Sequence, residues 1–499
     1  MKKKEKIIIL GSGFGGLATA ALLAKDGYQV TVLEKNEQPG GRASSLQSNG
    51  FRFDMGPSWY MMPDVFEKYF AEFGKKPSDF YKLTHLSPQY RVFFDDQTHI
   101  DVTGNLKTDK ATFESLEKGS ALNLDRYLAE SKVKYETSMD SILYRNMHSL
   151  LDLFTPNMAK KSAQLGVFQP MHRYVSRFFQ HPKLQQILEY NLVFLGCSPK
   201  NAPSLFSLMT HVDLNLGVWY PEGGISAVVN AVVKLGTQYG VTYVYNAPVQ
   251  KLLVENRHIT QVVTDEETYS ADIVISNADY RFTEDLLSDQ SLRTYSRNSW
   301  GKKVMTPSAF LLYLGVKGSI PELQHHNLYF GADWSKHFDD IFKHPRWPTE
   351  PSLYINKASQ SDTTVAPKGH ENLMVLVPIA PGLEESENWR THYADFIIQF
   401  IEEKMHIPLK KNIVYQKIFS VTDFQERYNS YKGNALGGLA HTLFQSAVWR
   451  PNNVSKKIPN LFFVGANTVP GIGVPPAFIS SHLVRDRVRE FTRQRETHD

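Results

Sequence analysis

The chain opens with an apolar run that stops at a glycine-rich turn. Residues 7–10 are four consecutive aliphatic side chains, which is typical of a strand buried on both faces of a parallel sheet. Residues 17–25 are rich in alanine and leucine and predict a helix, which Gly27 ends. A second strand pattern at 29–33 leads directly to Glu34. Together these segments predict a complete βαβ unit.

Comparable patterns recur much later in the chain. Strand-like segments lie at 241–245, 249–254, 271–276, 309–316, 373–378 and 460–464, and helix-like segments lie at 226–239, 393–404 and from 477 onward. Strands and helices mixed in this way indicate an α/β protein. At 499 residues the chain is too long for one ordinary core, so two or three domains are expected.

The turn after the first strand has the sequence of a dinucleotide-binding loop. Gly11 permits the tight turn, Gly13 lets the backbone approach a pyrophosphate, and Gly16 lets helix and strand pack closely. The helix N-terminus adds free N–H groups and a positive dipole end for phosphates. Glu34 stands 18 residues past Gly16, where its carboxylate accepts both ribose hydroxyls and repels a 2′-phosphate, which disfavours NADP. This loop alone does not decide whether the bound dinucleotide is NAD or FAD.

A second glycine motif follows Glu34 and favours FAD. Lys35 comes next, and the runs Pro39-Gly40-Gly41-Arg42 and Phe53-Asp54-Met55-Gly56-Pro57-Ser58 come shortly after it. These motifs resemble those of the flavoprotein superfamily that contains the amine oxidases and carotenoid desaturases. In that superfamily the Gly-Gly-Arg turn lies against the diphosphate and the flavin. The later run passes under the isoalloxazine ring.

The C-terminal region resembles the other side of the same flavin pocket. Gly465 and Ala466 follow the strand pattern at 460–464, and Val474 and Pro475 lead into the last helix. Proline suits a first helical turn, where a missing N–H costs nothing. In the resembled family this helix directs its N-terminus at the pyrimidine edge of the flavin. Many superfamily members have Asp directly after the glycine that corresponds to Gly465. This chain has Ala466 there, and the carotenoid desaturases differ from the amine oxidases in the same way.

Late blocks narrow the resemblance to the bacterial carotenoid (phytoene or 4,4′-diapophytoene) desaturases. They are GVWYPEGG at 217–224 and QSAVWRPN at 445–452, and the match also covers LGCSP at 195–199. The likeness runs nearly end to end, and the stretch MMPD at 61–64 is nearer to the C30, diapophytoene type. The choice between C30 and C40 substrates stays open, as do the number of desaturation steps and the final electron acceptor.

The resemblance implies a set of FAD contacts and a division into domains. The expected cofactor-binding residues are Gly11, Gly13, Phe14, Gly15, Gly16, Glu34, Lys35, Gly41, Arg42, Gly56, Pro57, Ser58, Val249 (at the adenine), Gly465, Ala466, Val474 and Pro475. The expected fold is a Rossmann-like FAD-binding domain of the amine-oxidase and glutathione-reductase type, with an α+β substrate domain and a helical, membrane-contacting subdomain. Their expected bounds are 1–80 with 217–285 and 441–499, then 81–140 with 286–440, and 141–216.

The chemistry of a polyene explains why the sequence shows no catalytic side chain. Such a substrate needs an apolar tunnel and an oxidant that accepts hydride at the flavin N5, and the polyene itself delocalises the developing cation. The cofactor performs the hard step, so the protein supplies orientation and dryness. Glu222 is interpreted as a solvated loop carboxylate, and Asp54 as a residue that caps or orients the Gly56 turn. The histidines have no metal-ligand spacing and are interpreted as surface or packing residues: His325, His326 and His441. No metal is expected.

Composition and charge argue against a nucleic-acid-binding protein and against a membrane-spanning one. A net charge of +4 with a pI of about 8.7 is too mild to indicate nucleic acid, and no stretch approaches the ~18 apolar residues of a membrane span. Cys197, the one cysteine, cannot form an internal disulfide. We expect a cytoplasmic protein, peripheral on the inner face of the cell membrane, with a lipophilic polyene as its substrate. The oligomeric state is not indicated.

Residues 141–216 mix large apolar side chains with basic ones. The apolar runs 149–154 and 178–179 lie among Lys160, Lys161 and Arg177. One interpretation is an interfacial surface through which a lipid-soluble substrate enters. The other is a helical subdomain whose apolar residues form its own core.

Alternatives to desaturation stay open on this scaffold. Isomerisation of a carotenoid, or oxidation of a terminal methyl group to an aldehyde, would use the same flavin site and tunnel. A binding protein for prenylated partners, without redox activity, is disfavoured by the intact Gly40-Gly41-Arg42 turn. Amine oxidation is discouraged by Ala466.

Overall fold

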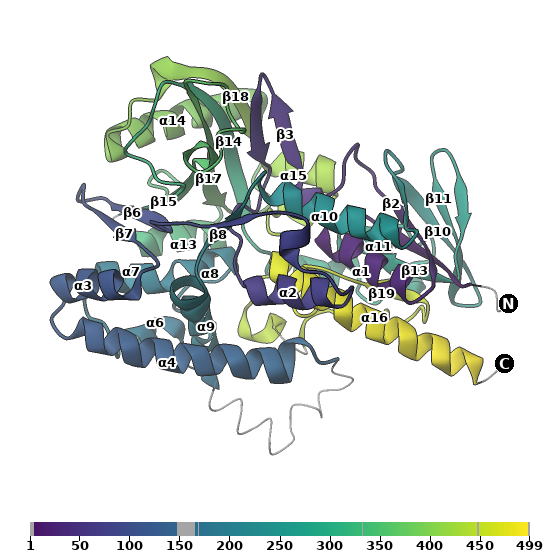
Figure 1. Cartoon of the computed structure of the whole chain (residues 1–499). Helices are drawn as coiled ribbons and strands as arrows, with labels where there is room; N and C mark the ends of the chain where they lie inside the picture. Colours follow the sequence, from purple (N-terminus) through teal and green to yellow (C-terminus); the bar gives the residue numbers. More distant parts are fainter. Residues whose placement is uncertain (1–3, 147–164, 168, 332, 447–448, 498–499) are drawn as a thin grey trace.

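Two large β-sheets, several smaller groups of strands and a layer of helices make up the computed structural model, which describes residues 4–146, 165–167, 169–331, 333–446 and 449–497 (Figure 1). The termini of the chain lie near the first sheet, at the opposite end of the molecule from helices α3 (Leu106–Leu116) and α7 (Pro182–Glu189). None of the helices in these described ranges combines the length and the apolar composition that crossing a bilayer requires.

The first sheet is assembled from distant parts of the chain. Its parallel strands lie in the order β19 (Leu461–Phe463), β13 (Ile273–Ser276), β1 (Lys6–Leu10), β2 (Gln29–Leu33) and β9 (Thr242–Val244). Aliphatic side chains on both faces of β1 are buried, because helices or loops cover the sheet on each side. The strand predictions for these five segments are therefore confirmed.

Helix α1 (Phe14–Lys25) is the centre of the helical cover on this sheet. It packs against α10 (Ile225–Gln238) and α16 (Val474–Glu496). Eleven of its twelve residues are buried, which explains why alanine and glycine dominate its sequence: small side chains let neighbouring helices approach closely. Phe14, its first residue, packs its ring 5.4 Å from that of Phe478 on α16.

A small antiparallel sheet extends from the first one. It consists of β10 (Val249–Glu255), β11 (His258–Thr264) and β12 (Thr268–Ser270). Asn460 links it to the main sheet, because its side chain accepts from Ile259 N at 2.9 Å and donates to the Ile259 carbonyl at 2.8 Å.

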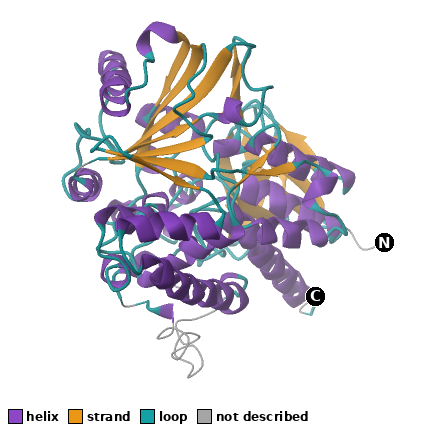
Figure 2. Ribbon diagram, turned by 60° about the vertical axis from the view of Figure 1, so that its left-hand side comes forward, coloured by secondary structure: helices purple, strands orange, loops and turns teal. Residues whose placement is uncertain are grey.

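The second sheet is mixed and lies beside the first (Figure 2). Its order is β18 (Ile413–Phe419), β14 (Ser308–Lys317), β17 (His370–Ile379), β16 (Leu353–Asn356), β15 (His326–Phe330), β6 (Tyr90–Phe94) and β7 (His99–Val102). Only β6 and β15 pair in parallel. One face buries an aliphatic core under α14 (Glu387–Met405), and the other face meets the helical layer.

The helical layer packs against the second sheet through aromatic side chains. Its helices are α3, α4 (Ser120–Ser138), α6 (Met171–Val175), α7, α8 (Asn191–Phe194) and α9 (Leu208–His211). Phe179 is fully buried, 5.9 Å from the rings of both Phe113 and Tyr127. This part of the layer therefore forms a core. Residues 149–154, Lys160 and Lys161 lie outside the described residues.

Shorter elements complete the fold. They are the hairpin β3 (Ser45–Ser48) and β4 (Phe51–Asp54), the pair β5 (Leu83–His85) and β8 (Trp219–Pro221), and the helices α2 (Pro63–Ala71), α11 (Tyr280–Asp285), α12 (Arg297–Gly301), α13 (Trp334–Phe342) and α15 (Val421–Tyr428).

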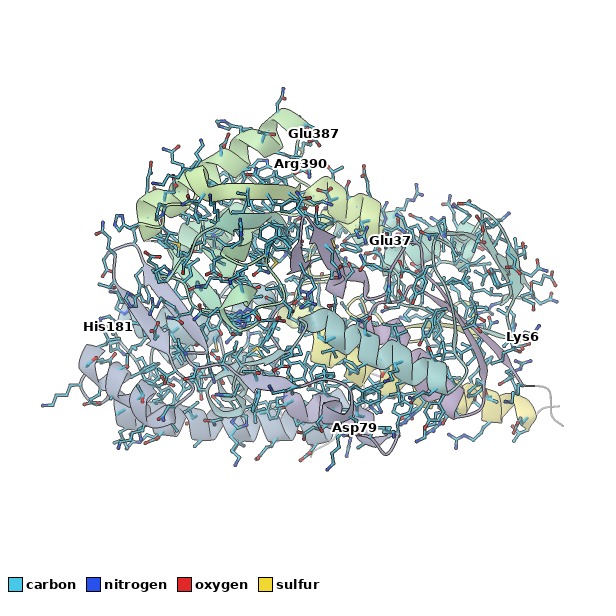
Figure 3. The ribbon with its side chains drawn as sticks, turned by 45° about the horizontal axis from the view of Figure 1, so that its top comes forward. Lys6, Glu37, Asp79, His181, Glu387 and Arg390 are labelled. Carbon is cyan, nitrogen blue, oxygen red and sulfur yellow. The ribbon has the colours of Figure 1, made fainter. Side chains whose placement is uncertain are left out.

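Charged pairs join α15 to the loop after β2 and to helix α14. Arg427 donates to Glu37 at 2.6 Å, and this bond lowers the pKa of the Glu37 carboxyl to about 2. Arg390 on α14 donates to Asp423 of α15 at 2.5 Å and to Glu387 at 3.0 Å. Figure 3 shows Glu37, Glu387 and Arg390 along the same upper side of the molecule. Helix α15 is thus paired both with the segment after β2 and with the helix that covers the second sheet.

Candidate active site

The glycine loop between β1 and α1 is so tight that two of its glycines are sterically required. Gly11 has φ +90° and donates to the Leu33 carbonyl of β2 at 2.8 Å. A Cβ on Gly16 would lie 2.2 Å from the Gly11 carbonyl oxygen, which is part of the backbone. The close packing of helix and strand predicted for Gly16 is therefore confirmed.

Asn277, which the sequence interpretation did not select, lies over this loop. It follows β13 and donates from Nδ2 to the Val464 carbonyl at 3.0 Å. A Cβ on Gly13 or Gly15 would come within 2.6 or 2.8 Å of its side-chain amide. The only signal in the sequence was its place at the carboxyl end of a parallel strand, where ligands of such sheets bind.

Glu34 lies at the end of β2 with its carboxylate buried and fully bonded. Ser12 donates to Glu34 Oε2 from both its backbone N and its Oγ at 2.7 Å. Asn36 donates to Oε1 from its backbone N and its Nδ2 at 2.9 Å. These bonds hold the carboxylate at the edge of the glycine loop, where the sequence predicts a ribose.

The Gly-Gly-Arg turn is joined to the glycine loop by backbone contacts. Gly40 donates to the Ser12 carbonyl at 2.8 Å, and a Cβ on Gly41 would lie 3.4 Å from the Gly13 Cα. Arg42 donates from Nη2 to Ser430 Oγ at 2.9 Å and to the Asn434 carbonyl. Burial lowers the pKa of its guanidinium, and Asp279 nearby opposes that effect.

The loop and the turn fit a flavin dinucleotide. Among the described residues, the buried Arg42 Nε has no hydrogen-bond partner, and such groups normally have one. The glycine cradle around Gly13 and Gly41 leaves backbone N–H groups at the start of α1, an arrangement that suits a diphosphate. Both features suit a flavin dinucleotide bound at this loop.

Two of the predicted contacts lie at the margins of this cluster. Lys35 directs its Nζ to Asn429 Oδ1 at 3.0 Å and to the Glu426 carbonyl, at the C-terminal end of α15. Val249 begins β10 and is half-buried. Their roles toward a cofactor stay proposals.

The C-terminal segment closes the cluster from the other side. Gly465, at φ +95°, lies so near that a Cβ on it would be 2.5 Å from Asn277 Nδ2, and its N–H donates to Ser480 Oγ at 3.1 Å. Ala466 follows, and its Cβ lies 3.4 Å from the place of a Cβ on Gly437. Helix α16 begins at Val474, with Pro475 in its first turn. Its positive dipole end points toward this cluster.

Residues 54–58, at and after the end of β4, link the flavin cluster to the second sheet. The flavin cluster is the glycine loop, the Gly40-Gly41-Arg42 turn, Asn277 and the segment from Gly465 to Pro475. A Cβ on Gly56 would lie 2.7 Å from the Arg42 carbonyl oxygen. Pro57 is half-buried, and Ser58 Oγ is 2.7 Å from the Tyr354 hydroxyl of β16. Asp54 accepts from the Ile225 N–H at 3.0 Å and so caps α10, and burial raises its pKa to about 6.

Trp59, the residue after Ser58, is surrounded by aromatic rings. It stacks on His326 at 4.1 Å between centroids, and Tyr90, Tyr190 and Tyr354 lie within 6.2 Å. The His326 Nδ1 is 2.7 Å from the Tyr354 hydroxyl, and burial holds the pKa of this imidazole well below its usual range. These five rings therefore form a closely packed aromatic box, and the imidazole within it is uncharged.

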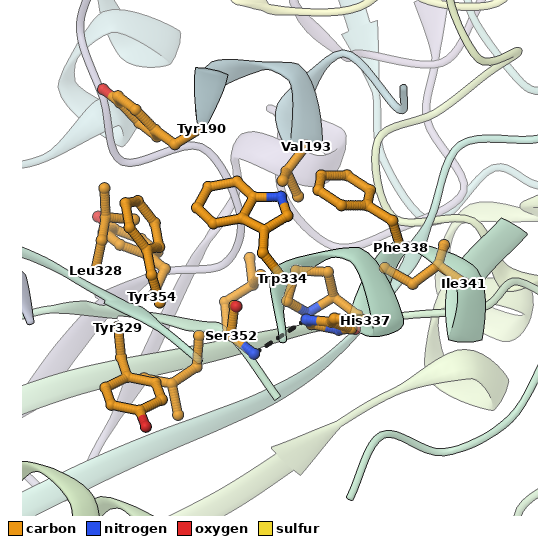
Figure 4. A pocket seen from close by; sticks show the side chains of 14 residues that line it. Tyr190, Val193, Leu328, Tyr329, Trp334, His337, Phe338, Ile341, Ser352 and Tyr354 are labelled. Atoms are coloured by element: carbon orange, nitrogen blue, oxygen red, sulfur yellow. Dashed lines mark hydrogen bonds between the residues drawn. The ribbon is translucent and has the colours of Figure 1, made fainter. Parts of the chain in front are cut away.

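An apolar pocket adjoins this box, between the second sheet and helices α8 and α13 (Figure 4). It is lined by Tyr190, Val193, Leu328, Tyr329, Phe330, Trp334, His337, Phe338, Ile341, Ser352, Leu353, Tyr354, Leu376 and Pro378. Because Tyr354 also contacts Ser58, the pocket begins next to the segment expected beneath the flavin ring.

The polar groups of the pocket wall are largely occupied by other protein groups. The hydroxyls of Tyr190 and Tyr329 donate to Asp213 at 3.2 Å and to Asp95 at 2.8 Å. His337 accepts from the Ser352 N–H at its Nδ1 and donates from Nε2 to the Pro378 carbonyl at 2.8 Å. The pocket therefore presents carbon to a ligand along most of its wall.

The other candidate residues have structural roles. Glu222 is exposed and pairs with Lys82 at 2.6 Å, as predicted for a solvated carboxylate. His325 is 2.8 Å from Ser361 Oγ, and His441 accepts from the Ile472 N–H at 3.3 Å. Both imidazoles are buried, which lowers their pKa values. Within the described ranges, no three His, Cys, Asp or Glu side chains converge as metal ligands would.

Comparison with known proteins identifies the family of the chain. Residues 14–488 match the family model described as flavin containing amine oxidoreductase. The chain is 46% identical to a carotenoid 3,4-desaturase of Haloarcula japonica over 97% of its length and 98% of the relative's. It is 35% identical to a zeta-carotene-forming phytoene desaturase of Myxococcus xanthus, with 97% and 94% covered. An oxidoreductase structure from Methanosarcina mazei aligns with a TM-score of 0.63 at 17% identity, covering 96% of this chain and all of that one.

Proposed function

The chain belongs to the flavin-containing amine oxidoreductase family and to the carotenoid desaturases within it, and on that premise we propose that it binds FAD and introduces conjugated double bonds into a carotenoid. The observation that carries the proposal is the apolar pocket beside Ser58. A polyene has no group for a charged side chain to recognise, and this pocket has a carbon wall whose histidine and tyrosine groups are bonded to protein.

The residues of the pocket act by orientation and by exclusion of water. When bound, FAD supplies the oxidant that accepts a hydride from the substrate. Trp334 and Phe338 of α13 line the pocket together with Leu328 and Leu376 of the sheet, and an apolar chain would lie among these side chains. The stacked pair Trp59 and His326 fixes the end of the pocket nearest the flavin cluster. A neutral imidazole there adds no charge that would attract water.

The proposal is tested with the purified, FAD-loaded protein in liposomes. Phytoene and 4,4′-diapophytoene are supplied separately, and the products are analysed by mass and by absorption. Loss of two hydrogens per step, with absorption bands moving to longer wavelength, is the expected result and identifies the chain length. Unchanged substrates would contradict desaturation of these two compounds. Coloured carotenes supplied next would then show whether the protein desaturates another carotenoid, isomerises it, or oxidises it to an aldehyde, and no loss of hydrogen from any of them would contradict desaturation.

We also propose that the protein binds peripherally to the inner face of the cell membrane, where carotenoids dissolve. Three exposed apolar side chains support this: Phe444, Trp449 and Val304 are 75%, 45% and 43% exposed. The rings of Phe444 and Trp449 lie 6.3 Å apart, and Gln445 accepts from the Val304 N–H. Lys302 is exposed next to them. Exposed aromatic groups with a neighbouring cation suit an anionic bilayer surface.

The double variant Phe444→Glu/Trp449→Glu is therefore expected to bind vesicles containing phosphatidylglycerol at least about tenfold more weakly. Burying one large apolar side chain contributes about 1.5–3 kcal/mol, and the new carboxylates also meet a like charge. Vesicle sedimentation measures the change. Val414, 52% exposed on β18, provides the control Val414→Glu, which should bind normally. An equal loss in both variants would show that the surface is not specific.

A further inference from the structure

Arg450 is a buried arginine that joins two loops at the C-terminal side of the flavin cluster. It is 3% exposed. Its Nη2 donates to the Ala466 carbonyl at 2.7 Å and to the Leu439 carbonyl at 3.0 Å. Its Nε donates to the Thr468 carbonyl at 3.0 Å, and its Nη1 donates to the Gln445 carbonyl at 3.3 Å. The guanidinium is thus held by backbone oxygens alone.

No negative side chain balances this charge. Within the part of the chain that the structure describes, Arg450 forms no ion pair with a carboxylate. Two of its titratable neighbours are neutral, because burial raises the pKa of the Cys197 thiol to about 12 and holds the pKa of His441 well below its usual range. A third neighbour, Lys303, is a second cation whose pKa is lowered by burial and by the charge of Arg450. Burial also lowers the pKa of Arg450 itself, to about 9. An unpaired charge inside a protein is costly, so an arrangement that retains one calls for a function.

The charge lies directly behind the loops that line the flavin cluster. A Cβ on Gly438 would be 3.3 Å from Arg450 Nη2, and a Cβ on Gly471 would be 3.6 Å from its Cζ. Gly471 is two residues before Gly473, the N-cap of α16. The guanidinium and the positive end of the α16 dipole therefore act on the same region.

We propose that Arg450 is a positioning residue that supplies a fixed positive charge for a flavin bound at this cluster and so stabilises the negative charge that the ring takes up on reduction. The inference rests on the proposed binding of FAD and does not depend on the identity of the carotenoid. The hydrogen bonds from Arg450 to the Ala466 and Thr468 carbonyls also polarise the peptide groups of this loop. That polarisation adds positive character to the N–H groups that a bound flavin would meet. In an apolar surrounding, such charges act strongly because water does not screen them.

The alternative is that Arg450 only clamps the loops, and two substitutions separate the roles. Arg450→Gln removes the charge, and Arg450→Lys keeps the charge but loses the fork of N–H groups. Arg293 provides the matched control Arg293→Gln, because its side chain is 9% exposed but is paired with Asp285 at 2.9 Å. The readout is the two-electron midpoint potential of the bound flavin, measured with dithionite as reductant, so that no carotenoid is needed.

Arg450→Gln is expected to lower the equilibrium constant for reduction roughly tenfold, which corresponds to a potential about 30 mV more negative for a two-electron couple. Arg450→Lys should stay near the wild-type potential while its melting temperature falls. A clamp alone predicts the reverse: both variants would lose stability and retain flavin weakly, with the potential of the bound flavin unchanged. That result would overturn the proposal.

A second measurement uses the unaltered protein, in case both Arg450 variants fail to fold. The absorption spectrum of the dithionite-reduced holoenzyme is recorded from mildly acidic to mildly alkaline pH. A reduced flavin that stays anionic over the whole range is expected from an adjacent fixed cation. A reduced flavin that is neutral at mildly acidic pH would contradict the proposal. A protein that retains no FAD at all would contradict the proposed function instead, so the two failures are distinguishable.

Discussion

Replacing Gly16 by alanine is expected to abolish flavin retention and to destabilise the protein. The new Cβ would lie 2.2 Å from the Gly11 carbonyl oxygen and 3.1 Å from the Asn277 Cβ. Because the first of these atoms is backbone, α1 has to move away from β1, and overpacking of this kind costs about 1–3 kcal/mol or more. The same movement pulls the helix N-terminus out of the phosphate-binding position. The flavin-to-protein absorbance ratio and the thermal unfolding midpoint measure both effects.

Gly301 provides the matched control for this substitution. It lies at the end of α12, and nothing stands within 4 Å of the place of its Cβ. Gly301→Ala should therefore leave both the flavin content and the melting temperature unchanged. Normal flavin content in Gly16→Ala would show that the loop can relax, and would refute the steric requirement at this position.

Leu376→Trp is expected to reduce carotenoid desaturation more than tenfold while the flavin content stays normal. Leu376 lies on β17, is half-buried and lines the apolar pocket. An indole at this position fills space that the polyene chain needs, and misplacement of a substrate by about 1 Å can cost about a hundredfold in rate. The flavin cluster is built from other elements, so its geometry is retained. Product formation in liposomes and the flavin spectrum are measured on the same preparation.

Val414→Trp is the control for added bulk on the second sheet. Val414 is 52% exposed on β18, and a larger side chain there extends into water. This variant should desaturate at the wild-type rate. If Leu376→Trp retained full activity, the pocket beside Tyr354 would not be the path of the substrate.

The first sheet could be predicted because its signals are local. The aliphatic runs of β1 and β2, the glycines between them and Glu34 lie within one stretch of 34 residues. Each glycine answers a constraint imposed by near neighbours in the chain, as Gly16 does toward Gly11. The later strands β13 and β19 were recognisable because strands buried on both faces must be continuously apolar. The end-to-end resemblance then indicated the cofactor.

The residues that the sequence did not reveal act across long separations. Asn277 touches glycines more than two hundred positions away, and its type alone indicates only a turn. In the sequence Arg450 looks like any other basic residue. Its partners are backbone carbonyls, so no acidic side chain in the sequence indicates that it is buried. The same holds for Trp59 and His326, which stack although far apart in the chain.

The sequence by itself thus determined the nucleotide-binding βαβ unit, the membership of a flavoprotein family and the α/β class. Only the tertiary structure decided that Asn277 lies over the glycine loop, that Phe179 belongs to a core, and that an apolar pocket opens beside Ser58. It also decided that Arg450 is a buried cation without a carboxylate partner among the described residues. The physical reason is that motifs encode backbone geometry within a few residues, whereas burial, charge balance and cavities arise from contacts between distant segments.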